Sequence, residues 1–131
     1  MPASWLADPH ETREVLDRFG LATKHRLGQN FLVDDRVVAR ILDLAQVGEN
    51  DVVLEVGPGI GTLTVALLAR ASAVCSIEAD RELEDVLADT CSSGSGRLAL
   101  VMGDALRVGE NDVRAALAAR ASWLRRIWSR A

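Results

Sequence analysis

One short stretch limits the fold of this chain more than any other, because it places three glycines at alternate positions between two apolar runs. The stretch reads EVGPGIGTLT, residues 55–64, and its glycines are Gly57, Gly59 and Gly61. The run before it, DVVLEV, is short and rich in β-branched residues, which favours a buried strand. The run after it, TLTVALLARA, has the composition and length of a helix. A strand, a glycine turn and a helix in this order predict the start of an α/β sheet.

The same alternation continues toward the C-terminus. The sequence predicts a strand at residues 72–80, a helix at 81–90, a flexible Ser/Gly turn at 91–96 and a third strand at 97–104. The strands are almost continuously apolar, which is typical of parallel strands covered on both faces. The order β-α-β-α-β therefore predicts the α/β fold class, with a parallel sheet and flanking helices.

Two further helices are predicted ahead of the sheet. Asp8, followed by Pro9, has the pattern of an N-cap with proline at the first helical position, and Gly20 is the expected end of that helix. The second helix is capped by Asp34 or Asp35 and is expected to end at Gly48.

The candidate binding residues follow the ends of the predicted strands, where ligands bind in open parallel sheets. These positions are the glycine turn, Glu78 with Asp80 after the second strand, and Asp104 after the third. Glu78 follows Gly57 by 21 positions, a spacing at which a carboxylate can accept hydrogen bonds from both hydroxyls of a ribose. Dinucleotide-binding proteins use the same arrangement, so this spacing alone does not identify the cofactor.

The glycine spacing separates the two cofactor classes. A dinucleotide fingerprint would need Gly or Ala at position 62 or 64, and both positions hold threonine, which argues against a nicotinamide dehydrogenase. Glu55, Glu78 and Asp104 instead surround the turn with carboxylates. Such a ring suits the ammonium and sulfonium of S-adenosyl-L-methionine better than a pyrophosphate. The competing interpretation is that the glycines only form a tight turn.

Four segments together resemble a known family. GQNFLVDD (28–35), LEVGPGIGTLT (54–64), IEAD (77–80) and GDAL (103–106) are similar to the first half of the bacterial small-subunit ribosomal RNA adenine dimethylases, relatives of the erythromycin-resistance methylases. The resemblance covers roughly residues 11–108. It implies a Rossmann-like, S-adenosylmethionine-dependent methyltransferase sheet, and a product, N6,N6-dimethyladenosine, in small-subunit rRNA. The implied partner is that rRNA or the ribosomal particle.

The resemblance also implies roles for five cofactor-binding residues. Asn30 and Leu32 would line the methionine or adenosine side of the cofactor, and Gly57 would let the methionine portion approach the turn. Glu78 would bind the ribose hydroxyls and Asp104 the adenine amino group. The roles of Gly57, Glu78 and Asp104 agree with the strand-end argument, whereas those of Asn30 and Leu32 depend on the resemblance alone.

The family's acceptor motif, Asn-Leu-Pro-Tyr after a fourth strand, does not occur in this chain. The sequence contains no tyrosine, and its prolines are Pro2, Pro9 and Pro58. We therefore assign no catalytic residue, and we expect a sheet truncated after about three strands that does not methylate rRNA by itself. The alternative is a non-catalytic fragment that binds the cofactor or RNA.

The predicted domain organisation has two parts. Residues 1–112 form the N-terminal part of a cofactor-binding domain, and residues 113–131 form a tail with five arginines and no acid. Three interpretations of the tail remain open: a basic amphipathic helix on RNA or a membrane surface, a helix packed over the sheet, or a tail without a selected role, such as a frameshift product, which its abrupt change of composition favours. Without a fourth strand, DVVLEV would be a bare apolar edge, so we expect marginal stability or aggregation unless the tail covers it.

The remaining features exclude several classes of protein. No segment is long and apolar enough to cross a bilayer and the first residues lack a signal-peptide pattern, so the cytoplasm is expected and a membrane partner is not. Cys75 and Cys91 form no metal motif and are interpreted as small buried side chains. The basic loop Lys24–Arg26 is either an rRNA phosphate contact or a solvated turn. The sequence does not predict an oligomeric state.

Overall fold

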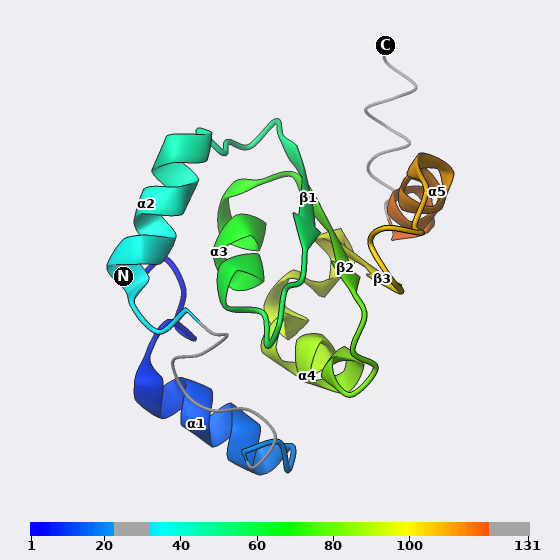
Figure 1. Ribbon diagram of the computed structural model, residues 1–131. Helices are drawn as coiled ribbons and strands as arrows, with labels where there is room; N and C mark the ends of the chain where they lie inside the picture. Colours follow the sequence, from blue (N-terminus) through cyan, green and yellow to red (C-terminus); the bar gives the residue numbers. More distant parts are fainter. Residues whose placement is uncertain (23–31, 121–131) are drawn as a thin grey trace.

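The computed structural model describes residues 1–22 and 32–120 (Figure 1). It has the predicted α/β class, with helices on both sides of a three-stranded parallel sheet. The elements in chain order are α1 (Pro9–Arg18), α2 (Asp35–Ala45), β1 (Val52–Val56), α3 (Thr62–Arg70), β2 (Ala73–Glu78), α4 (Leu83–Thr90), the 3₁₀ helix η1 (Ser92–Arg97), β3 (Leu98–Met102) and α5 (Glu110–Arg120).

The sheet has the order β1-β2-β3, with β2 in the middle. Both pairings are parallel: Leu54 pairs with Cys75 across β1 and β2, and Cys75 pairs with Ala99 across β2 and β3. All six residues of β2 are buried, as expected for a strand covered on both faces. The carboxyl ends of the three strands therefore meet at one edge of the sheet.

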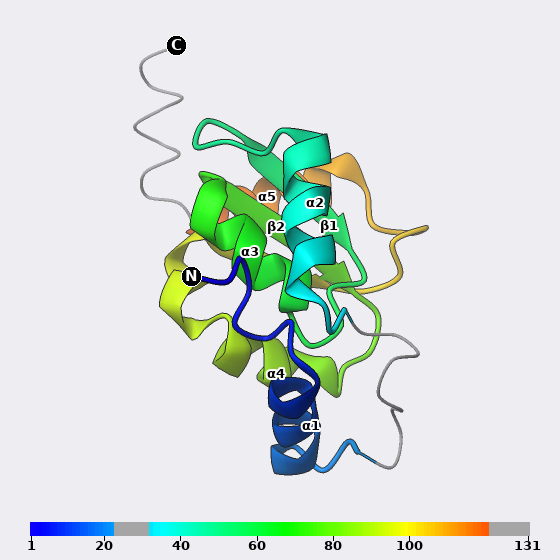
Figure 2. The same cartoon turned by 90° about the vertical axis from the view of Figure 1, so that its left-hand side faces the viewer.

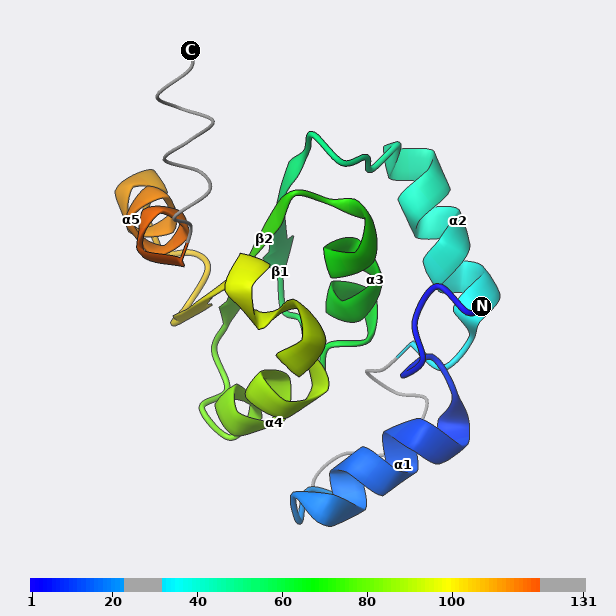
Figure 3. The ribbon, with the colours of Figure 1, turned by 180° about the vertical axis from the view of Figure 1, so that it is seen from behind.

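The two faces of the sheet are covered unequally. α3 lies on one face and α5 on the other (Figures 1 and 3), and α2 packs on the outer side of α3 (Figure 2). The main core lies on the α3 face, where apolar side chains of the sheet meet α1, α2, α3 and α4. Its fully buried members include Leu6, Val15, Val38, Leu42, Ile60, Val74, Val86 and Leu87.

The helix starts follow the predicted capping pattern. Asp8 Oδ1 accepts hydrogen bonds from the backbone N–H groups of His10 (2.8 Å) and Glu11 (3.1 Å) at the start of α1. Of the two candidate caps of α2, Asp34 is the N-cap. Asp35 has another role: its carboxylate accepts from the backbone N–H groups of Ala3 (3.0 Å) and Ser4 (2.7 Å), which holds the N-terminal segment on the core.

Two local predictions are wrong. α2 does not end at Gly48 but at Ala45, and Gln46 takes the left-handed conformation (φ 53°) that closes it. The Ser/Gly segment after α4 is not a flexible turn, because residues 92–97 form η1. Tertiary contacts explain the second difference. Gly94 packs against Leu68, and the guanidinium of Arg97 donates to the carbonyl oxygens of Leu68 and Ala71 at the end of α3.

The bare apolar edge predicted for the first strand is confirmed. β1 lies at the edge of the sheet, and Val52, Leu54 and Val56 remain 47%, 55% and 63% exposed. These three residues share one face because side chains alternate along a strand. α5 packs on that face against β3 and β2 and leaves the β1 side chains uncovered.

Candidate cofactor site

The glycine turn leaves β1 at the edge where the strand ends meet. Gly57, Gly59 and Gly61 have φ angles of 71°, 61° and 99°, a region that residues with a side chain rarely adopt. The Gly57 N–H donates to the Ile77 carbonyl of β2 (2.9 Å), which extends the β1–β2 pairing into the turn. The turn therefore has a defined conformation that other residues would strain.

The glycines differ in what surrounds them. A Cβ atom at Gly61 would lie 2.8 Å from Thr90 Oγ1, 3.0 Å from Cys91 Sγ and 3.2 Å from Leu87 Cδ2, all on or beside α4. The space beside Gly61 is thus filled by the protein itself. A Cβ atom at Gly57 would meet nothing within 4 Å, so Gly57 is open to a ligand.

Glu55 lies on β1, two residues before Gly57, and is 8% exposed. Its Oε1 accepts hydrogen bonds from Thr64 Oγ1 (2.6 Å) on α3 and Ser76 Oγ (2.8 Å) on β2. Burial raises the pKa of Glu55, the two hydroxyl hydrogen bonds oppose that shift, and the neighbouring charge of Glu78 adds to it. The buried carboxyl group of Glu55 thus connects β1 to α3 and to β2, the central strand.

Glu78, the predicted ribose acceptor, is joined to the turn. Its Oε1 accepts from the Gly59 N–H (3.2 Å) and its Oε2 from the Asp80 N–H (2.8 Å). Asp104 lies after β3, where its Oδ1 accepts from the Leu106 N–H (2.9 Å) and its side chain stays exposed. Glu78 and Asp104 thus lie on neighbouring strand ends, which are held together by the hydrogen bond from the Gly103 N–H to the Glu78 carbonyl (2.8 Å).

A hollow of about 130 Å³ opens beside the turn. It contains two of the predicted site residues, Leu32 and Gly57, but neither Glu78 nor Asp104 belongs to its lining. Asn30 and the basic loop Lys24–Arg26 lie outside the described residues. The lining is Leu32, Glu55, Val56, Gly57, Pro58, Thr62 and Leu63.

The sequence prediction missed Thr62 and Leu63 as candidate site residues. Both belong to the first turn of α3 and follow the third glycine directly, a position that could have marked them as the start of a helix facing the ligand. A larger hollow of about 250 Å³ lies between α4, η1 and β3. None of the predicted binding residues lines this larger pocket. The volume of a pocket therefore does not identify the candidate binding site in this protein.

Among residues 1–22 and 32–120 no three His, Cys, Asp or Glu side chains are grouped as metal ligands. No helix in the same ranges is long and apolar enough to span a membrane. What the strand ends do provide is carboxylate oxygens, backbone N–H groups and an open glycine.

The comparison with protein families and the comparison with curated proteins give the same result, a match to rRNA methyltransferases. The family described as ribosomal RNA adenine dimethylase matches residues 20–115. The ribosomal RNA small subunit methyltransferase A of Nocardia farcinica is 45% identical over an alignment of 114 residues, which covers 84% of this chain and 39% of that protein. The chain spans about a third of the length of the curated relatives that it matches.

Solved structures agree with this result. The crystal structure of the 23S rRNA methyltransferase ErmE is 38% identical, with a TM-score of 0.56 over 60% of this chain and 32% of that one. An RNA methyltransferase from Salinibacter ruber, solved in complex with S-adenosyl-L-homocysteine, is 25% identical, with a TM-score of 0.52 over 56% of this chain and 50% of that one.

Proposed function

The chain belongs to the ribosomal RNA adenine dimethylase family, and from this premise we propose that it forms the S-adenosylmethionine-binding part of an rRNA adenine N6-methyltransferase. The observation that carries the proposal is the bond between Glu78 and the Gly59 N–H, because it holds a carboxylate beside an open glycine turn at the strand ends. This is where ligands bind in parallel α/β sheets.

The proposed cofactor lies across the ends of the three strands. Its methionine portion enters the hollow beside Gly57 and Leu32, its ribose binds Glu78, and its adenine amino group binds Asp104. The oxygens of Glu78 each accept one backbone hydrogen bond and keep further lone pairs for ribose hydroxyls. Asn30 is assigned to the same site from the family resemblance.

The electrostatics support a cationic ligand. Glu55 and Glu78 are both buried close to the turn, and their mutual repulsion is one of the causes that raise the pKa of Glu55. A sulfonium and an ammonium placed between them would relieve that repulsion, whereas a pyrophosphate would increase it. The family's members use S-adenosylmethionine, in agreement with this preference.

Methyl transfer would be an in-line displacement at the methyl carbon of the cofactor: adenine N6 would form the new C–N bond, the C–S bond would break, the sulfur would leave as a neutral thioether, and N6 would release a proton to solvent. The Asn-Leu-Pro-Tyr motif that would hold the adenine is missing from the sequence, so we assign no catalytic residue and propose that this chain alone does not dimethylate small-subunit rRNA. Robust dimethylation of ribosomal particles by the purified chain would overturn that part of the proposal.

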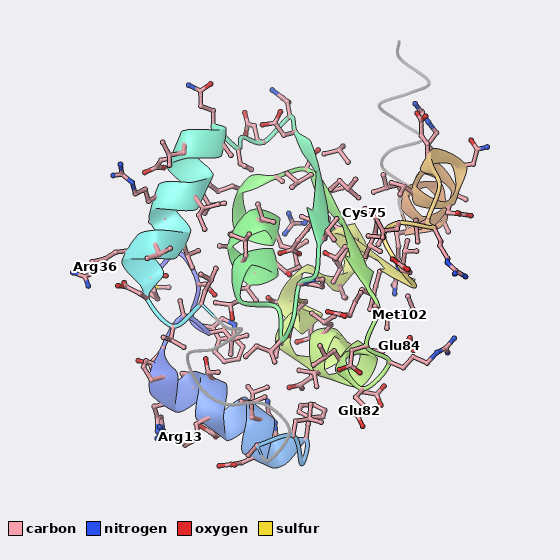
Figure 4. All side chains as sticks on the ribbon, in the orientation of Figure 1. Arg13, Arg36, Cys75, Glu82, Glu84 and Met102 are labelled. Carbon is pink, nitrogen blue, oxygen red and sulfur yellow. The ribbon has the colours of Figure 1, made fainter. Side chains whose placement is uncertain are left out.

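A second candidate is a non-catalytic fragment that binds RNA. Arg13 on α1 and Arg36 on α2 project away from the sheet (Figure 4), and both are exposed. Arginines 125, 126 and 130 add basic charge to the end of the tail. Because α5 (Glu110–Arg120) crosses the predicted boundary at 112, deletion of residues 121–131 removes these three arginines and keeps all described residues of α5. Salt-dependent RNA binding that this deletion abolishes would favour the second candidate.

Isothermal titration calorimetry tests the cofactor proposal. The chain is titrated with S-adenosylmethionine and with NAD, and only the first is expected to bind. Glu78→Ala should lower that affinity by at least tenfold, whereas Glu84→Ala, which removes an exposed carboxylate from α4, should leave it unchanged (Figure 4). Binding of NAD, or a Glu78→Ala variant with full affinity, would contradict the proposal.

A further inference from the structure

The last residue of α4 is hydrogen-bonded to the glycine turn. Thr90 is 4% exposed, and its Oγ1 donates to the carbonyl oxygen of Ile60 at 2.8 Å, across 30 residues of chain. Ile60 is fully buried, and within residues 1–22 and 32–120 no other group donates to its carbonyl oxygen. The Thr90 hydroxyl therefore satisfies a buried peptide group in the middle of the turn.

Gly61 makes this contact possible. A Cβ atom at Gly61 would lie 2.8 Å from Thr90 Oγ1, which is closer than the Cβ atom of another residue could come. The lack of a side chain at Gly61 therefore leaves room for the hydroxyl of Thr90 to reach the carbonyl of the preceding residue. The third glycine of the turn thus serves a contact with α4, whereas Gly57 faces open space.

The turn has little conformational preference of its own. Glycine adopts positive and negative φ angles about equally readily, so a turn with a glycine on each side of Ile60 has to be fixed by its contacts. The Gly57 N–H is bound to the backbone of β2 and the Gly59 N–H to Glu78, also on β2. Both contacts hold the first half of the turn. Thr90 holds the second half from α4.

We propose that Thr90 is a positioning residue for the cofactor: its hydroxyl fixes the peptide group that follows Ile60, and so keeps the glycine turn in the conformation that the cofactor binds. This inference rests on the proposed function, since the turn is part of that site. Thr90 does not line the hollow beside Gly57, so it acts through the turn and not by touching the ligand. The connection is short, because Gly59, whose N–H donates to Glu78, directly precedes Ile60.

Calorimetry with S-adenosylmethionine compares Thr90→Val with a matched control. Thr12 also has a buried hydroxyl group, which donates to the carbonyl oxygen of Leu6 (3.1 Å) at the start of α1. Thr90→Val and Thr12→Val each lose one buried hydrogen bond, so both should lower the melting temperature. Only Thr90→Val should also lower the affinity, by roughly tenfold, and Thr90→Ser, which keeps a hydroxyl group, should restore it. The variants are measured in sucrose, which favours the folded state.

Hydrogen exchange of the backbone amides in the ligand-free chain is a second measurement. Thr90→Val should speed exchange at Gly59 and Gly61 by roughly tenfold relative to the native chain, because the turn opens more often, and Thr12→Val should not. If the native chain does not bind S-adenosylmethionine, the proposed function fails, and the exchange rates still test whether Thr90 holds the turn.

Three results would overturn the inference. The first is native affinity in a folded Thr90→Val variant, and the second is an equal loss of affinity in Thr12→Val. The third is a Thr90→Val chain that does not fold where Thr12→Val does, because the hydroxyl would then support the whole fold and not the turn. Unchanged exchange at both glycines would refute the role of Thr90 in the turn without reference to any ligand.

Discussion

Thr64 Oγ1 donates a 2.6 Å hydrogen bond to Glu55 Oε1, and this contact joins β1 directly to the helix on the far side of the glycine turn. Ser76 on β2 donates to the same oxygen. The buried carboxyl group of Glu55 on β1 is thus hydrogen-bonded to both α3 and β2, the elements on either side of the turn. Glu55 therefore holds the elements around the candidate site together, in addition to lining its pocket with a carboxyl group.

The raised pKa of Glu55 predicts a pH-dependent stability. Because the folded-state pKa lies above the ordinary value of 4.5, the stabilisation from this group is complete below that value and is lost as the pH rises through the folded-state pKa. Glu55→Gln keeps an acceptor for Thr64 and cannot ionise. The native chain should therefore lose stability relative to Glu55→Gln as the pH rises, measured by urea unfolding between about pH 4.5 and 8. A relative loss toward acid pH would contradict this.

Gly61→Ala should destabilise the protein strongly. The new Cβ atom would lie 2.8 Å from Thr90 Oγ1 and 3.0 Å from Cys91 Sγ, at a φ of 99°. Overpacking and the left-handed conformation together predict a loss of roughly 2–5 kcal/mol in the free energy of unfolding. Urea denaturation measures it, and a loss below about 1 kcal/mol would show that α4 moves easily.

Gly57→Ala is the matched comparison and should mainly affect binding. Its Cβ atom would meet no other atom within 4 Å, so only the strain at a φ of 71° remains, about 1–2 kcal/mol. The methyl group would occupy space beside the hollow that Gly57 lines. We expect the affinity for S-adenosylmethionine to fall at least tenfold in calorimetry while the variant stays folded. An unchanged affinity would show that no ligand approaches this glycine.

The thiol of Cys91 should be unreactive in the folded protein. Cys91 is 2% exposed, and burial raises its pKa to about 11. Cys75 is also buried, with a raised pKa from the same cause. Neither should react with Ellman's reagent at about pH 8 until urea unfolds the chain. Rapid labelling without denaturant would indicate that the region around α4 opens readily.

The exposed side chains of β1 should promote self-association. Leu54 is 55% exposed on an edge strand that carries no charge on that face. Leu54→Lys should reduce the apparent mass at high protein concentration, measured by light scattering, with a stability change of about 0.5 kcal/mol or less. Val53→Lys, on the core side of the same strand, should instead unfold the protein. A native chain that stays monomeric at high concentration would contradict the prediction.

The sequence alone predicted the five elements that form and flank the sheet, and from them the strand ends that carry the candidate site residues. Short β-branched runs and a glycine turn are local signals, and they located β1, α3, β2, α4 and β3. Glu78 and Asp104 were chosen as candidate binding residues because parallel strands end at a common edge, so their positions follow from the order of the strands. Their roles in binding stay a prediction. These signals need no knowledge of distant contacts.

Other features depend on partners far away in the chain. The Ser/Gly segment forms η1 because Gly94 meets Leu68 and Arg97 binds the end of α3, about 26 to 29 residues away. The role of Gly61 is another example. Gly61 belongs to the same alternating run of glycines as Gly57, but side chains on or beside α4 fill the volume next to Gly61.

The sequence by itself determined the fold class, the family and which residues follow the strand ends, because these follow from periodicity, turn chemistry and motif spacing. Only the tertiary structure decided which polar side chains near the glycine turn already have hydrogen-bond partners within the protein. Thr64 and Ser76 donate hydrogen bonds to Glu55, whereas Thr62, two residues from Thr64, is buried and has no hydrogen-bond partner within residues 1–22 and 32–120. Hydrogen bonding of a buried group depends on which distant atoms surround it, and that is a property of packing.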